Sequence, residues 1–237
     1  LLRQRRLRAI GMAQAAIRPG RPQASDFLLD RAVEDVVWRL SAIKRQFARA
    51  VVLNGFGGLI AERLRGAPSV GSVIEAETRA RPVDDADVSG RPSSQRIDDE
   101  ILPFGEASLD LIVSCLDMHW INDLPGLLVQ ARRALKPDGL MIAALMGGRT
   151  LSELREALLV AEVEIEGGAS PRVAPFAGVR DLGALLQRAK FALPVTDVDT
   201  VTATYADPLA LMHDLRAMGA GNVLSARSRK PLRRTTL

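Results

Sequence analysis

The chain of 237 residues has few of the residues that build disulfides or metal centres, namely one cysteine, Cys115, and two histidines. A single cysteine excludes an internal disulfide and fits a reducing compartment. Histidines, cysteines and acids nowhere share the spacing of metal ligands, so we expect no metal site. The sequence also lacks a run of about 18 apolar residues, and we therefore expect no transmembrane segment.

Aromatic residues make up only 4% of the chain, and its basic residues gather at the two ends. Six arginines precede the first acid, Asp26, and five basic residues lie in the last 13 positions, 225–237, after the last acid, Asp214. Without aromatics among them to stack on bases, these ends predict solvated tails, and nucleic acid is not an expected partner. We predict a basic segment over 1–24, one domain over 25–224 and a basic tail over 225–237.

The first segment is rich in arginine, free of acid and compatible with a helix, which is also the character of a mitochondrial transit peptide. It lacks the apolar core of a secretory signal and the serines usual in a transit peptide. We predict a cytoplasmic bacterial protein, with the mitochondrial matrix as the alternative.

Strands and helices alternate along the rest of the chain, which predicts an α/β fold with a doubly wound, mostly parallel sheet and helices on both faces. We expect a helix from Ser25 to about Arg49, a second strand that ends at Glu75, and a helix capped by Asn122 or Asp123. A T-x-x-E capping box at Thr150 predicts another helix that reaches about Glu166. The remaining expected elements are strands over 50–53, 108–116, 140–146 and near 194–203, and helices over 60–65, from Asp181, and from Asp207 to Gly219.

In such folds ligands bind at the carboxyl ends of the strands, so the residues that follow each apolar run are the candidates for a site. "VVLNGFGGL", residues 51–59, runs from a strand into a glycine turn that suits either a cofactor or an ordinary strand-to-helix connection. Glu75 can accept hydrogen bonds from ribose hydroxyls, and "DDEILPF", 98–104, can meet adenine. "SCLDMHWIND", 114–123, brings further polar groups to the same edge. The candidate cofactor-binding residues are Asn54, Gly55, Gly57, Gly58, Glu75, Asp99, Glu100 and Ser114, and the candidate catalytic residues are His119 and Trp120.

This arrangement resembles the class I S-adenosylmethionine-dependent methyltransferases. The stretches "LPFGEASLDLIVSCLDMHWINDLPG", "LKPDGLMIAALMGGRTLSELREAL" and "EGGASPRVAPF" are similar to the methyltransferase-like family that includes the mitochondrial complex I assembly factor and its alphaproteobacterial relatives. The malonyl-carrier-protein methyltransferase of biotin synthesis is a more distant likeness. The resemblance implies S-adenosylmethionine as the cofactor and a protein side chain as the acceptor.

The sequence departs from the family at the glycine turn and at the end of the fold. Members that bind cofactor usually carry an acid in the first strand and the pattern G-x-G-x-G after it. Aligned on the following helix, Val52 stands in place of the acid, and Asn54, Phe56 and Gly58 stand in place of the glycines. We therefore expect weak cofactor binding. We also expect the sheet to lack its last strand, with a tendency to self-association.

The resemblance leaves three functions open. The first is a methyltransferase that acts on a protein side chain, in complex I assembly. The second is an arginine hydroxylase on the same fold. The third is a noncatalytic assembly or chaperone-like module with a degenerate cofactor site.

Overall fold

The computed structural model describes residues 27–56, 58–78, 94–98, 100–228, 230 and 232–233. The chain divides into two compact units. The first comprises residues 28–146 and 179–197 and contains the sheet. The second comprises the described residues of 147–178 and 198–233. Each unit is described in turn below.

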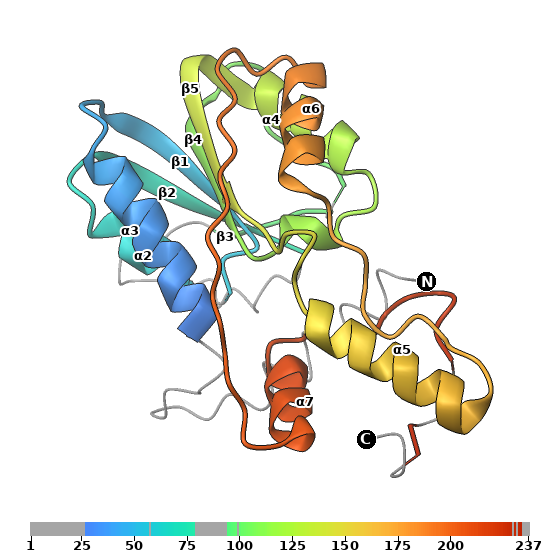
Figure 1. Cartoon of the computed structure of the whole chain (residues 1–237). Helices are drawn as coiled ribbons and strands as arrows, with labels where there is room; N and C mark the ends of the chain where they lie inside the picture. Colours follow the sequence, from blue (N-terminus) through green and yellow to red (C-terminus); the bar gives the residue numbers. More distant parts are fainter. Residues whose placement is uncertain are drawn as a thin grey trace. The chain divides into compact units, whose positions relative to one another are not determined.

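The described part of the first unit holds one parallel sheet with the strand order β3-β2-β1-β4-β5 (Figure 1). Neighbouring strands are parallel throughout, which confirms the predicted fold class. All seven residues of β4 are buried, as expected of a strand covered on both faces. The strands are β1 (Phe47–Leu53), β2 (Val70–Glu77), β3 (Ser94–Arg96), β4 (Leu109–Cys115) and β5 (Leu135–Ala144).

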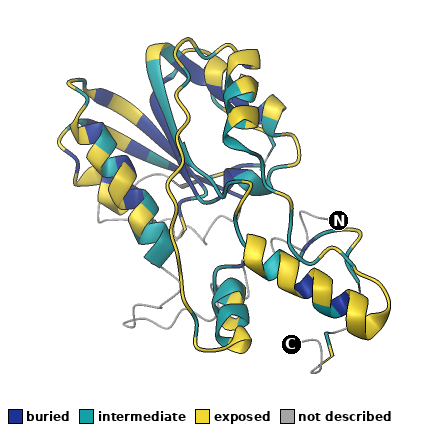
Figure 2. Cartoon of the chain, in the orientation of Figure 1, coloured by how far each residue is buried: buried dark blue, intermediate teal, exposed yellow. Residues whose placement is uncertain are grey.

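Helices cover both faces of this sheet (Figure 1). Helices α2 (Phe27–Ser41) and α3 (Leu59–Arg65) pack with β1, β2 and β4 around one hydrophobic cluster. Helices α4 (Leu124–Ala134) and α6 (Val179–Arg188) contribute to a second cluster on the other face. Because side chains alternate along a strand, each central strand contributes to both clusters. Figure 2 shows the inner strands largely buried and the outer surfaces of the helices exposed.

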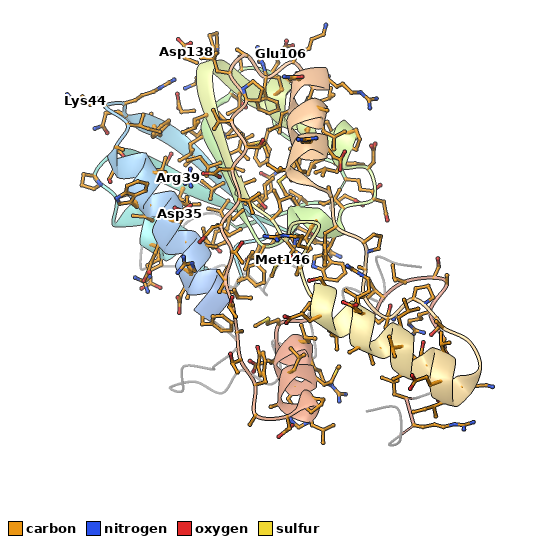
Figure 3. All side chains as sticks on the ribbon, in the orientation of Figure 1. Asp35, Arg39, Lys44, Glu106, Asp138 and Met146 are labelled. Carbon is orange, nitrogen blue, oxygen red and sulfur yellow. The ribbon has the colours of Figure 1, made fainter. Side chains whose placement is uncertain are left out.

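The parallel arrangement collects the carboxyl ends of the strands at one edge of the sheet. Lys44, Glu106 and Asp138, which lie near the amino ends of β1, β4 and β5, are at one end of the sheet in Figure 3. Met146, which follows β5, lies toward the opposite end. The segments after β1, β2 and β4 therefore meet where ligands bind in open α/β sheets.

Two predicted helix starts are confirmed by their caps. The carboxylate of Asp123 accepts a hydrogen bond from the backbone N–H of Gly126 at 2.9 Å, at the start of α4. The carboxylate of Asp207 accepts one from the N–H of Ala210 at 2.8 Å, at the start of α7 (Pro208–Ala217). In both helices a proline occupies the first turn, where its missing N–H costs little.

Several predicted boundaries are wrong. Helix α2 ends at Ser41 rather than near Arg49, because Phe47 is the first residue of β1 and is fully buried in the sheet. The predicted cap Ser25 lies outside the described residues. The Thr150 capping box does not form, since α5 (Ser152–Glu166) begins after Leu151, whose φ of 54° is left-handed. Strand β2 continues two residues beyond Glu75.

The predicted strand near 194–203 is also wrong. Six of these ten residues are valine or threonine and most are exposed, but no residue from 192 to 205 is in a strand. In the described part of the chain no strand pairs with them, and β-propensity produces a strand only where a partner supplies the ladder. Leu193 and Val195 are 91% and 83% exposed as a result.

The second unit is organised around a buried acid of α5. Glu162 is 2% exposed and accepts hydrogen bonds from the backbone N–H of Ser170 at 2.8 Å and from Nε of Arg172 at 2.6 Å. Two turns earlier on the same face of α5, Arg155 donates to the backbone carbonyl of Ala174 at 3.2 Å. Two polar anchors thus hold the 170–174 segment against a helix that is otherwise largely exposed (Figure 2).

The stabilisation that the Glu162 carboxylate provides depends on pH. Burial alone would raise the pKa of Glu162, but the hydrogen bonds from Ser170 and Arg172 and the charge of Arg172 lower it below its ordinary value of 4.5. A carboxyl whose pKa is lower in the folded state stabilises the fold above its ordinary pKa. That contribution disappears as the pH falls through the lowered pKa.

We predict that Glu162→Gln lowers the free energy of unfolding at pH 7 by about 3 kcal/mol, because it leaves the partly buried Arg172 without its counter-charge. The difference in the free energy of unfolding between the variant and the native chain should become smaller as the pH falls from about 5 to about 3. Denaturant unfolding at several pH values measures both. Glu164→Gln, an exposed site on the same helix, is the matched control. A difference that stays constant down to pH 3 would contradict this assignment.

Candidate cofactor site

The turn after β1 has three left-handed residues at alternate positions. The φ angles are 50° at Asn54, 51° at Phe56 and 101° at Gly58. These are the three positions at which the family pattern places glycine. A left-handed conformation costs a residue with a Cβ about 1–2 kcal/mol, which is why glycine is usual there. The turn therefore keeps the shape of a three-glycine loop although two glycines are replaced. Gly57 lies outside the described residues.

The side chain of Asn54 joins the ends of three strands. Its Oδ1 accepts hydrogen bonds from the N–H of Thr78 at 2.9 Å and from Oγ1 of Thr78 at 3.0 Å. Its Nδ2 donates to Oδ2 of Asp117 at 2.6 Å. Thr78 follows β2 and Asp117 follows β4, so one amide links the turn after β1 to both neighbours. Sequence reasoning missed Thr78 and Asp117, whose only signal is their position just after a strand.

Two acids of β2 lie beneath this turn. Glu75 accepts a hydrogen bond from Arg65 at 3.0 Å, and its carboxylate lies next to the backbone of Gly58. Glu77 is the last residue of β2 and is 7% exposed. A Cβ added at Gly55 would lie 3.9 Å from Oε1 of Glu77, so the turn passes close to this acid too. Glu77, rather than the predicted Glu75, stands at the carboxyl end of the strand.

Ser114 lies one residue before the end of β4 and opposite Leu53 in the β1 register. It is fully buried, and its hydroxyl has no hydrogen-bond partner within the part of the chain that the structure describes. A buried hydroxyl without a partner costs free energy. Its position at the carboxyl edge of the sheet is that of a group whose partner arrives with a ligand.

The segment proposed to meet adenine is held by α4. Glu100 accepts a hydrogen bond from Nδ2 of Asn122 at 3.1 Å, and its carbonyl accepts one from Nε2 of Gln130 at 2.8 Å. Leu102 is buried beside it. Asp99 lies outside the described residues.

The candidate catalytic residues lie in a short 3-10 helix, Met118–Trp120, directly after β4. The rings of His119 and Trp120 are half-buried, with centroids 5.1 Å apart and planes tilted by 43°. Cys115 is not a nucleophile here, because burial, and then the Asp35 carboxylate, raise the pKa of its thiol to about 12. No three His, Cys, Asp or Glu side chains group as metal ligands within the described ranges.

These residues suit the two ends of S-adenosylmethionine unequally. At the nucleoside end, Glu77 and the unpaired Ser114 hydroxyl offer polar groups for a ribose, and the turn lets a ligand approach the main chain at Gly55. The Asn54–Asp117 hydrogen bond joins the segments that follow β1 and β4. The polar groups suit a nucleoside, and we expect this hydrogen bond to narrow the methionine end.

Comparison with known proteins agrees with this fold. Residues 54–143 match the family model described as a methyltransferase domain. The structure is similar to the YcgJ protein of Bacillus subtilis, with a TM-score of 0.52, 16% identity and 69% of each chain covered. The chain is therefore a protein of the class I methyltransferase fold, as the resemblance of its sequence predicted.

Within that class its relatives lie in two groups. It is 39% identical to the human protein named arginine-hydroxylase NDUFAF5, mitochondrial, over 87% of this chain and 60% of the relative. It is 43% identical to the malonyl-acyl-carrier-protein O-methyltransferase of Xylella fastidiosa over 59% of this chain and 43% of the relative. The chain thus spans about 60% of the human protein's length. Among the described residues, no helix has the length and apolar character needed to cross a bilayer.

Because Phe56 has a left-handed φ, we predict that glycine at this position gives a more stable protein than alanine. Phe56→Gly and Phe56→Ala both remove a ring that is 38% exposed, but only alanine keeps the left-handed strain. Glycine should be the more stable by about 1 kcal/mol in thermal or denaturant unfolding. The usual order, alanine above glycine, would show that this residue does not hold a left-handed conformation in solution.

Ser114→Ala should leave the free energy of unfolding of the ligand-free protein unchanged or raise it by up to about 1 kcal/mol, because it removes a buried hydroxyl that has no partner in the described structure. Binding of S-adenosylhomocysteine, followed by calorimetry, should weaken. A loss of stability of about 1 kcal/mol or more without ligand would mean that the hydroxyl already has a partner.

Proposed function

We propose that this chain is an S-adenosylmethionine-dependent methyltransferase-like enzyme that modifies a protein side chain during the assembly of respiratory complex I. The observation that supports it most is the turn at 54–58, whose three left-handed residues lie over two β2 acids at the carboxyl edge of the sheet. An ordinary strand-to-helix connection does not need three left-handed residues. Complex I and the protein acceptor rest on the family resemblance.

Each residue in this proposal has one role. Glu77 accepts hydrogen bonds from the ribose hydroxyls, and Glu100 with Asp99 meets the adenine. Ser114 gives its unpaired hydroxyl to the cofactor. His119 and Trp120 line the place of the acceptor, because they follow the central strand. The cofactor supplies an already activated methyl group on its sulfonium, so the protein's task is mainly alignment and exclusion of water.

Two alternatives each have an observation in their favour. Arginine hydroxylation is favoured by the relatives at 38–39% identity, which are named arginine-hydroxylase. A noncatalytic assembly module is favoured by the Asn54–Asp117 hydrogen bond, which we expect to narrow the methionine end. The relatives named mitochondrial support the matrix as the alternative to the bacterial cytoplasm. Self-association remains a proposal for the unpaired edge of the sheet.

The three functions predict different products on the acceptor. The protein is incubated with S-adenosylmethionine and a complex I subunit fraction from cells that lack it, and the subunits are analysed by peptide mass spectrometry. We expect the gain of one CH2 on a side chain. A mass increase of one oxygen would show hydroxylation in place of methylation. No mass change, with complex I assembly restored by the purified protein, would support the noncatalytic module.

Trp120→Ala is the variant that tests the acceptor end in the same assay. It should reduce the modified fraction about tenfold or more while the melting temperature falls only slightly, since the ring is half-buried. A melting temperature that collapses while turnover per folded molecule is unchanged would make Trp120 a core residue.

A further inference from the structure

Glu75 is a buried acid for which the roles above leave no task. It is 8% exposed, and Arg65 is the one hydrogen-bond donor to its carboxylate within the described residues. A carboxylate can accept about four hydrogen bonds, so most of its capacity remains. A buried charge is normally paired, and the ion pair with Arg65 at 3.0 Å engages only one of its two oxygens.

The backbone of the glycine turn passes directly over this carboxylate. A Cβ added at Gly58 would lie 3.5 Å and 3.7 Å from the two oxygens of Glu75. Gly58 also has a φ of 101°, a conformation that residues with a Cβ rarely adopt. The left-handed turn therefore favours glycine at this position, and the carboxylate of Glu75 lies in van der Waals range of it.

The neighbouring strand has no charge at the same level. Val52 of β1 is the register partner of Glu75, and it is fully buried. Val52 and Val73 belong to the same hydrophobic cluster, and Glu75 follows Val73 by two residues, so both side chains lie on one face of the sheet. At the level of Val52, the acid beneath the turn is therefore carried by β2 rather than by β1.

We propose that Glu75 is a positioning residue that holds the turn and supplies the negative charge that attracts the cationic methionine end of the cofactor, a task that Val52 cannot perform. This proposal rests on the proposed function, because it names what S-adenosylmethionine binding requires from this chain. The carboxylate acts through the turn rather than by contact with the ligand. Because water is largely excluded around it, its charge is screened less there than at the surface.

Two probes separate charge from shape. S-adenosylmethionine carries a sulfonium and an ammonium, whereas 5′-methylthioadenosine keeps the nucleoside and carries neither. In calorimetry, Glu75→Gln should lower the affinity for S-adenosylmethionine about tenfold or more. It should lower the affinity for 5′-methylthioadenosine by less than about twofold. Glu77→Gln should weaken both, since the ribose is common to the two ligands.

A transplant of the carboxylate provides the sharper test. Glu75→Val should lower the affinity for S-adenosylmethionine as Glu75→Gln does. The double variant Val52→Asp, Glu75→Val should bring the affinity back to within about threefold of the native chain, because the charge returns to the same face of the sheet, one strand away. Arg65→Gln is the matched control. It removes the partner of Glu75 but keeps the carboxylate, so binding should be retained or strengthened.

The outcomes separate this inference from the proposed function. If the native chain binds neither probe, the proposed function fails and the inference fails with it. If the native chain binds both, but Glu75→Gln weakens both equally or neither, only the inference is overturned. If Arg65→Gln weakens the binding of S-adenosylmethionine as much as Glu75→Gln does, Glu75 acts only as the partner of Arg65, and the inference is overturned. Circular dichroism confirms that each variant is folded.

Discussion

The side-chain amide of Asn54 holds together the carboxyl edge of the sheet, where the turn after β1 meets the segments that follow β2 and β4. It bonds to Thr78 after β2 and to Asp117 after β4, and it does so from a left-handed backbone that asparagine tolerates better than most residues. Glycine at this position would give the same turn without the links. Asparagine at this position therefore adds cohesion among the segments that follow three strands.

The acids of β2 explain how the site remains suited to a nucleoside after these changes. Residues two apart on a strand share a face, so Glu75 and Glu77 both lie beneath the turn. Only Glu77 stands at the end of the strand, while Glu75 is engaged by Arg65 inside it. The site is thus divided between an acid that can meet a ligand and an acid that supports the loop over it. The second unit also has a buried acid, Glu162, whose hydrogen-bond partners come from the segment that follows its helix.

The sequence was sufficient to predict the parallel sheet and two helix caps, because apolar runs and Asp-to-amide caps are local signals, as at Asp123 and Asp207. It was not sufficient where the outcome depends on a distant partner. Residues 194–203 have strong β-propensity but pair with no strand in the described structure. Asn54 was recognised as a lost glycine, but its links to Thr78 and Asp117 span 24 and 63 residues. The limit of β2 was misjudged because its last residues, Ala76 and Glu77, do not differ in pattern from a loop.

The central claim is that the turn at 54–58 still holds a nucleoside cofactor. Native mass spectrometry of the chain, purified under mild conditions without added ligand, tests it most directly. The account predicts a partly occupied state whose mass excess and released small molecule correspond to S-adenosylmethionine or S-adenosylhomocysteine. A protein that carries no nucleoside as purified, and takes up neither compound when they are added in excess, would contradict it.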